Sequence, residues 1–200
     1  MNSIKKLSKE DILKIETLTN KFIDNTLANE SPFKMCFNIC FPLHLHLKNN
    51  CIENSIRAGK CESIQHFWLH LEDIDQTIID PTIRQFSFGE NKPSIYIGKK
   101  TKDYNEDTIP ITDWFDKTYD GWLTTFRLPE CYSSGETKVD FNLSLKIHLT
   151  ASNIINKDIE KMKIDISKSI LLGKYLSGIN EIIEISNRKC FSQYLTKNNE

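Results

Sequence analysis

Residues 64–81 read IQHFWLHLEDIDQTIIDP, and this stretch decides the expected fold. From Ile64 to Leu71 the side chains alternate between two dissimilar faces, which is typical of a strand. A polar loop follows, and Thr77–Asp80 predicts a second strand that ends before Pro81. The two strands are therefore expected to form an antiparallel hairpin.

The register of this hairpin places His66 and Asp80 on the same face. If the polar residues after Leu71 form the loop, Leu71 pairs with Thr77, and Trp68 lies opposite Asp80. His66 and Asp80 are then diagonal neighbours at about 7–8 Å, which is close enough for their side chains to meet. A slip of one residue would put them on opposite faces.

Two helices are expected before the hairpin. Ser8 can cap the first, in which apolar residues recur at helical spacing as far as Leu27. Residues 35–47 are mostly apolar and predict the second, which Pro42 must kink unless it lies close to the start.

The chain after the hairpin is expected to be largely helical. Residues 94–98 predict a third strand, whereas residues 139–149 fit either an alternating strand or a helical stripe, and both alternatives stay open. Residues 159–195 have a helical pattern, with interruptions at Gly173 and Gly178.

Length and composition exclude several classes of protein. The 200 residues suit a single domain, residues 1–200. A balance of 26 basic and 27 acidic side chains, for a net charge of −1, predicts no binding to nucleic acid or to an anionic membrane. Without a signal peptide or a run of about 20 apolar residues, a cytoplasmic protein with six reduced cysteines is expected.

Cys36 is the candidate nucleophile, because it opens the expected second helix and a thiol at a helix start near an imidazole is readily activated. His66 would be its general base, and Asp80 would orient the imidazole. Backbone amides, including that of Cys36, would stabilise the oxyanion. Cys40, one turn further along, is expected in the core and is the second choice of nucleophile.

Roughly residues 33–104 contain a set of ordered motifs: Met35-Cys36-Phe37, Phe41-Pro42-Leu43-His44-Leu45-His46-Leu47-Lys48, Ile52-Glu53-Asn54, Gly59, His66-Phe67-Trp68-Leu69, Ile79-Asp80-Pro81-Thr82, Gln85-Phe86 and Tyr96-Ile97-Gly98-Lys99-Lys100. On these motifs the chain resembles a family of small bacterial and phage-borne proteins in the papain-like and transglutaminase-like superfamily. The resemblance leaves residues 105–200 as an extension whose role it does not define.

The resemblance implies an α+β fold in which a helix bearing Cys36 packs on an antiparallel sheet bearing His66 and Asp80. Its C-terminal part would cover the sheet or shape a cleft. The implied function is that of a cysteine hydrolase or acyltransferase that acts on a protein or peptide amide through a thioester on Cys36. Protease, amidase, deamidase and transglutaminase reactions share this first half, and no cofactor is predicted.

Two other functions stay open. The chain could be a non-catalytic interaction domain on the same fold. It could also be a zinc-stabilised binding module that uses His44, His46 and nearby cysteines, although a helix turns these two histidines about 200° apart. We therefore predict no metal site.

The aromatic residues and the remaining histidines complete the expected site. Trp68, Trp114 and Trp122 are predicted to bind substrate as the walls of a pocket. His70 and His148 are expected to be solvated. The sequence does not predict an oligomeric state.

Overall fold

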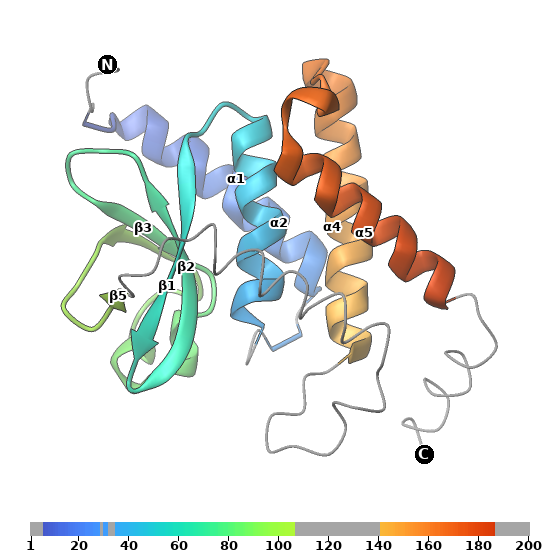
Figure 1. Ribbon diagram of the computed structural model, residues 1–200. Helices are drawn as coiled ribbons and strands as arrows, with labels where there is room; N and C mark the ends of the chain where they lie inside the picture. The colour runs from blue at the N-terminus through green and yellow to red at the C-terminus, as the bar shows by residue number, and fades with distance from the viewer. Residues whose placement is uncertain (1–5, 29, 32–34, 107–140, 187–200) are drawn as a thin grey trace, which may run out of the picture.

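The computed structural model describes residues 6–28, 30–31, 35–106 and 141–186, and these residues form an α+β fold. An antiparallel sheet lies on one side and a group of helices on the other (Figure 1). The α+β class that the sequence predicts is therefore confirmed.

The first helix, α1 (Lys9–Leu27), begins where its capping signal predicts. Ser8 Oγ accepts a hydrogen bond from the amide of Asp11 at 3.1 Å, and the carboxylate of Asp11 accepts one from the amide of Ser8 at 2.9 Å. This reciprocal pair satisfies two amides that the helix leaves without partners.

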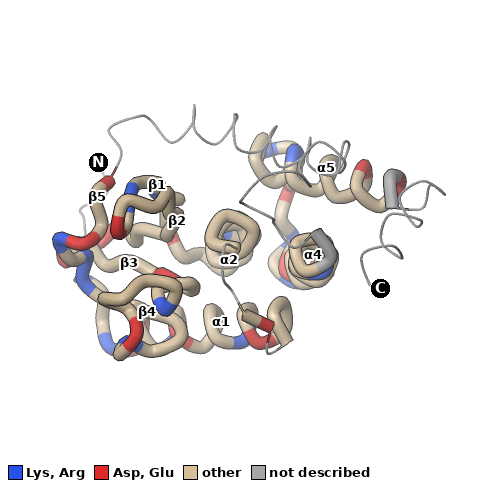
Figure 2. Tube along the Cα trace, turned by 90° about the horizontal axis from the view of Figure 1, so that it is seen from below, with Lys and Arg blue, Asp and Glu red and all other residues tan. Residues whose placement is uncertain are grey.

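The second helix, α2 (Cys36–Asn49), is the central element of the fold. Its side chains are buried on nearly every side, because the sheet packs against one face and α4 against the opposite one (Figures 1 and 2). This explains its almost uniformly apolar sequence. The helix runs through Pro42, which lies in its interior, so packing on both sides outweighs the lost hydrogen bond.

Five strands form the sheet in the order β4-β3-β2-β1-β5. Their bounds are Asn54–Cys61 (β1), Ile64–Leu71 (β2), Thr77–Asp80 (β3), Tyr96–Lys99 (β4) and Asn105–Glu106 (β5). Strands β2 and β3 pair with Leu69 opposite Ile79 and His70 opposite Ile78, which is the predicted register. Two short 3-10 turns, Ile83–Gln85 (η1) and Ser87–Gly89 (η2), follow β3.

Strand β1 was not predicted, and its turn explains why. It forms a tight hairpin with β2 in which Cys61 pairs with Ile64. The two turn residues, Glu62 and Ser63, have φ values of 48° and 67°. Such turns normally carry Asn or Gly, so Glu-Ser gives no turn signal in the sequence.

The described residues after 140 are mainly helical, so residues 141–149 follow the helical alternative and not the strand. Helix α4 (Phe141–Met162) is followed by a 3-10 turn, Ile166–Lys168 (η4), and by α5 (Ile170–Ser186). The sequence predicted interruptions of the helical pattern at Gly173 and Gly178, but α5 runs through both residues. The interruption lies instead at Lys163, which has φ 53°. Asp165 then caps η4 by accepting a hydrogen bond from the Ser167 amide at 3.1 Å.

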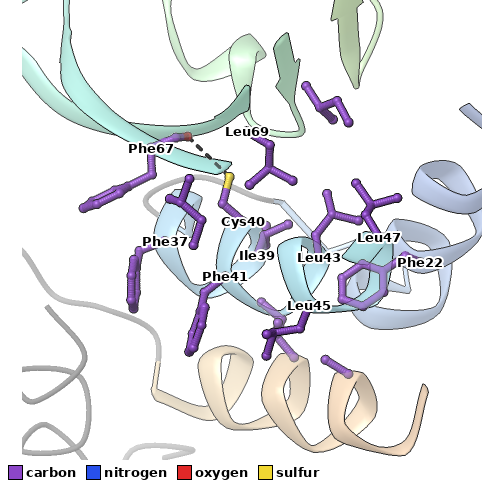
Figure 3. Packing of buried hydrophobic residues seen from close by; sticks show 14 of the residues in the cluster. Phe22, Phe37, Ile39, Cys40, Phe41, Leu43, Leu45, Leu47, Phe67 and Leu69 are labelled. Carbon is purple, nitrogen blue, oxygen red and sulfur yellow. Dashed lines mark hydrogen bonds between the residues drawn. The ribbon is translucent and has the colours of Figure 1, made fainter. Parts of the chain in front are cut away.

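The main hydrophobic core surrounds α2 and joins both halves of the described chain (Figure 3). Residues Ile147, Ala151 and Ile155 of α4 pack into the same cluster as residues of α1, α2 and the sheet. The C-terminal helices therefore cover α2, whereas the sequence suggested that they would cover the sheet or shape a cleft. A second cluster lies on the other face of the sheet and contains Cys61, Trp68, Ile78, Ile83, Phe86 and Tyr104.

None of the helices within the described ranges combines the length and apolarity needed to cross a membrane. Four cysteines in these ranges carry free thiols: Cys36, Cys40, Cys51 and Cys61. Cys131 and Cys190 lie outside the described residues.

Candidate active site

His66 and Asp80 form a fully buried pair between adjacent strands. His66 Nε2 lies 2.8 Å from Asp80 Oδ2, and neither side chain is accessible to solvent. His66 comes from the middle of β2 and Asp80 from the last position of β3, so the observed register makes them diagonal neighbours. An ionised carboxylate can only accept, so Nε2 carries the hydrogen.

Four hydrogen bonds satisfy the Asp80 carboxylate. Oδ1 accepts from the Thr82 amide at 2.9 Å and the Thr82 hydroxyl at 3.2 Å, as in a turn stabilised by an Asp side chain. Oδ2 accepts from His66 and from the Tyr104 hydroxyl at 2.9 Å. Burial, followed by the charge of Asp80, raises the pKa of Tyr104, so the phenol remains a donor.

Aromatic rings enclose the imidazole of His66. Phe86 meets it edge-on at 4.7 Å between centroids, and Trp68 stacks at 6.0 Å. The Tyr104 ring lies at 6.4 Å and also packs edge-on against Trp68. These contacts fix the ring plane and exclude water from the Asp80 side.

Cys36, at the first position of α2, is partly exposed and is one of the groups that raise the pKa of His66. Since Nε2 faces Asp80, Nδ1 is the ring nitrogen that remains for the sulfur. Burial acts to lower the pKa of His66, but the hydrogen bonds to Asp80 and Cys36 and the charges of both groups raise it to about 9. His66 is therefore protonated at neutral pH, between a carboxylate and a sulfur.

The start of α2 also supplies hydrogen-bond donors beside the sulfur. The first hydrogen bond of the helix runs from the Ile39 amide to the Met35 carbonyl, so the amide of Cys36 precedes the helical ladder. Amides at this end carry the positive end of the helix dipole, which favours negative charge on a nearby sulfur or oxygen.

Gln85 is a site residue to which the sequence gave no role. Its Nε2 lies 3.2 Å from His66 Nδ1 and 3.1 Å from Thr82 Oγ1. The side chain therefore reaches the edge of the imidazole that remains for Cys36. The signal was present in the Gln85-Phe86 motif, but only the fold brings η1 back to β2.

Two further thiols near the site are buried and protonated. Cys40 Sγ donates to the carbonyl of Phe67 at 3.4 Å, and burial, followed by the charges of Asp80 and Cys36, raises its pKa well above the usual value (Figure 3). Burial, followed by the charge of Asp80, raises the pKa of Cys61 to about 12. The expectation that Cys40 belongs to the core is confirmed, and it is unsuited to act as a nucleophile.

A buried polar cluster holds the first turn of α2 against the C-terminal helices. Asn38 Oδ1 accepts from Ser144 Oγ at 2.8 Å and from His148 Nε2 at 3.0 Å. His148 Nδ1 lies 3.2 Å from the Tyr175 hydroxyl. His148 was expected to be solvated, but it is fully buried, and burial lowers its pKa to about 3. His70, also expected to be solvated, is partly buried.

The histidines at the other end of α2 do not converge on a metal site. His44 Nδ1 pairs with Asn54 at 2.7 Å, whereas His46 Nδ1 pairs with Asp158 at 2.5 Å. Within the described ranges no group of three His, Cys, Asp or Glu side chains could hold a metal ion.

Of the three tryptophans predicted to bind substrate, the structure describes Trp68. Trp68 is fully buried in the second cluster, so its ring supports His66 and Tyr104 and is not a surface that substrate can reach. Lys100 Nζ lies 6.0 Å from the centre of the Trp68 ring. Trp114 and Trp122 lie outside the described residues.

Comparison of the chain with models of known protein families gave no match, and comparisons with curated proteins and with solved structures gave none either.

Proposed function

We propose that the protein is a cysteine hydrolase or acyltransferase acting on the amide bonds of a protein or peptide. One observation carries this proposal: His66 binds a buried, fully satisfied carboxylate through Nε2 and lies near enough to Cys36, a partly exposed thiol at a helix start, for that group to raise the pKa of the imidazole. The roles of nucleophile, base and orienting group then fall to Cys36, His66 and Asp80. The papain-like or transglutaminase-like resemblance of residues 33–104 supports the same assignment.

In the first half of the reaction, the Cys36 proton is already held on Nδ1 of the His66 imidazolium, and the sulfur attacks the carbonyl carbon of the substrate. A carbon–sulfur bond forms while the carbonyl π electrons move to oxygen. The Cys36 amide and the Gln85 side-chain amide are the donors proposed for that oxyanion. The carbon–nitrogen bond then breaks, and the departing nitrogen takes the proton from Nδ1.

In the second half, water or an amine attacks the thioester. His66 Nδ1 accepts a proton from the attacking group, the carbon–sulfur bond breaks and the Cys36 thiolate leaves. Asp80 stays ionised throughout and stabilises each imidazolium that forms. Because the nucleophile must remain a thiol, we place this activity in a reducing compartment, which for this chain is the cytoplasm.

The test compares two cysteines of the same protein. Cys51 is exposed and lies outside the site, whereas Cys36 is only partly exposed. Under limiting iodoacetamide at pH 6.5, we expect mass spectrometry to show Cys36 carboxamidomethylated at least about ten times faster than Cys51, because an adjacent imidazolium favours thiolate.

The His66→Gln variant should abolish this difference, and the Cys51→Ala variant should leave the Cys36 rate unchanged. Equal rates at Cys36 and Cys51 in the wild-type protein would instead support the non-catalytic interaction domain, in which the fold is kept without an activated thiol.

A further inference from the structure

We propose that a groove between α1, α2 and α4 binds a small organic anion that carries an apolar body. The groove has a volume of about 520 Å³, within the usual range of about 300–1,000 Å³ for small-molecule sites. Its polar floor is His46, ten residues along α2 from Cys36. That separation corresponds to about 15 Å along a helix axis, so the groove is distinct from the candidate active site.

A buried, oriented imidazole forms the floor of the groove. His46 Nδ1 lies 2.5 Å from Asp158 Oδ2, with 7% and 12% of the two side chains exposed. Phe22 stacks against the imidazole at 5.2 Å. The Asp158 carboxylate accepts from Nδ1, and Nε2 has no hydrogen-bond partner within the described ranges. The pair therefore holds one ring nitrogen in a fixed direction for a partner outside the chain.

Lysines at the rim make the groove positive. Lys21 comes from α1, and Lys157 and Lys161 come from α4, which adjoins α1 and α2 (Figure 2). These exposed side chains form no ion pair with any described residue. Asp158 is the acidic residue that lines the groove, and His46 already engages it. A carboxylate, sulfonate or phosphate is the complementary group.

The apolar walls of the groove favour a ligand with an apolar body attached to its anionic group. Leu18, Phe22 and Ile154 supply apolar surface on two different helices. Burial of a hydrocarbon or aromatic group against such a wall is favourable, whereas an inorganic anion gains nothing from it. The wall therefore favours an organic anion over free phosphate.

The experiment compares two fluorescent probes on the full chain. The first, 1-anilinonaphthalene-8-sulfonate, carries a sulfonate; the second, N-phenyl-1-naphthylamine, has the same rings without a charge. We expect saturable 1:1 binding of the sulfonate probe. Its affinity should be at least about five times that of the neutral probe, because the lysines attract the sulfonate through contacts that solvent partly screens. Absence of saturable sulfonate binding, or equal affinity for both probes, would overturn the proposal.

A pair of charge-matched variants tests the location. Replacing Lys21, Lys157 and Lys161 by Gln should weaken sulfonate binding at least about fivefold and leave the neutral probe unaffected. The control replaces Lys9, Lys60 and Lys102, which are also exposed and do not line the groove, and should bind as the wild type does. Equal losses in the two variants would show a general charge effect and refute the groove as the site.

An independent measurement needs no variant. In ¹H–¹⁵N spectra of the wild-type protein, titration with the sulfonate probe should shift the side-chain amide signals of Asn25, Asn50 and Asn153, which line the groove. The Asn38 amide, at the other end of α2, should not move. Shifts confined to residues outside the groove would refute the proposal even if binding is tight.

Discussion

His148 Nε2 donates a hydrogen bond to Asn38 Oδ1 over 3.0 Å and so ties α4 to the first turn of α2. Asn38 lies two residues after Cys36, and Ser144 donates to the same oxygen at 2.8 Å. The position of the candidate nucleophile is therefore held by a helix more than 100 residues away in the sequence. This contact also makes the fold sensitive to acid.

Acid should destabilise the protein through His148 and His44. Burial lowers their pKa values from 6.5 to about 3 and about 4, so on acidification the unfolded chain takes up protons before the folded one does. Their contribution to stability is present above pH 6.5 and is lost as pH falls toward 4 and then 3. The urea midpoint of the wild type should decrease as the pH is lowered from 7 to 5. The decrease should be smaller in His148→Gln, whose side-chain amide can still donate to Asn38 without titrating. A wild-type midpoint independent of pH in this range contradicts the prediction.

Alkali should destabilise the protein through His66. Its folded pKa of about 9 lies above the ordinary value of 6.5, so its contribution is complete below pH 6.5 and is lost as pH rises through about 9. By linkage the loss is on the order of 1–3 kcal/mol. Urea midpoints at pH 6.5, 8 and 9.5 should decline in the wild type and stay nearly constant in His66→Gln. Parallel declines in the two proteins would assign the effect to other groups.

Tyr104→Phe should lower both the stability of the fold and the reactivity of the Cys36 thiol. The change removes one of four donors to Asp80 and leaves a buried carboxylate less well satisfied, at a cost of about 1–3 kcal/mol. Because Asp80 then holds His66 less firmly, alkylation of Cys36 should slow several-fold. Tyr96→Phe is the matched control, because the Tyr96 hydroxyl donates to the Lys99 carbonyl, over 2.8 Å, and not to the Asp80 carboxylate. The idea fails if both variants behave alike.

Gln85→Met should separate oxyanion stabilisation from activation of the thiol. Acylation of Cys36 by p-nitrophenyl acetate forms an oxyanion, whereas alkylation by iodoacetamide does not. Loss of a side-chain donor to an oxyanion typically costs about 100-fold or more in rate. We expect acylation, followed by nitrophenolate release, to fall by at least about tenfold while alkylation changes less than about threefold. Equal effects on both reactions would make Gln85 a residue that only positions His66.

The parts of the fold with local signals were predictable from the sequence. Ser8 and Asp11 form the capping box at the start of α1. Alternation and the polar loop after Leu71 predict the β2–β3 register that brings His66 to Asp80. Strand β1 was missed because Glu62-Ser63 adopts a turn conformation that these residues rarely take.

Features that depend on long-range packing were not predictable. Residues 139–149 alternate as a strand would, and helix α4 forms because Ile147, Ala151 and Ile155 then lie on one face and pack into the core around α2. The Asn38–His148 contact and the approach of Gln85 to His66 also depend on long-range packing, so the sequence did not predict them. Each partner is an ordinary polar residue until the fold places it.

His66 and Asp80 belong to one short hairpin, whereas Cys36 begins helix α2, which packs against α4 on the side away from the sheet. During synthesis on the ribosome, β2 and β3 are complete long before residue 148 emerges. A nascent chain can thus assemble its imidazole–carboxylate couple early and still leave Cys36 unanchored. We expect the Cys36 thiol to gain its reactivity only once the C-terminal helices have docked, so that an unfinished chain does not yet carry an activated thiol.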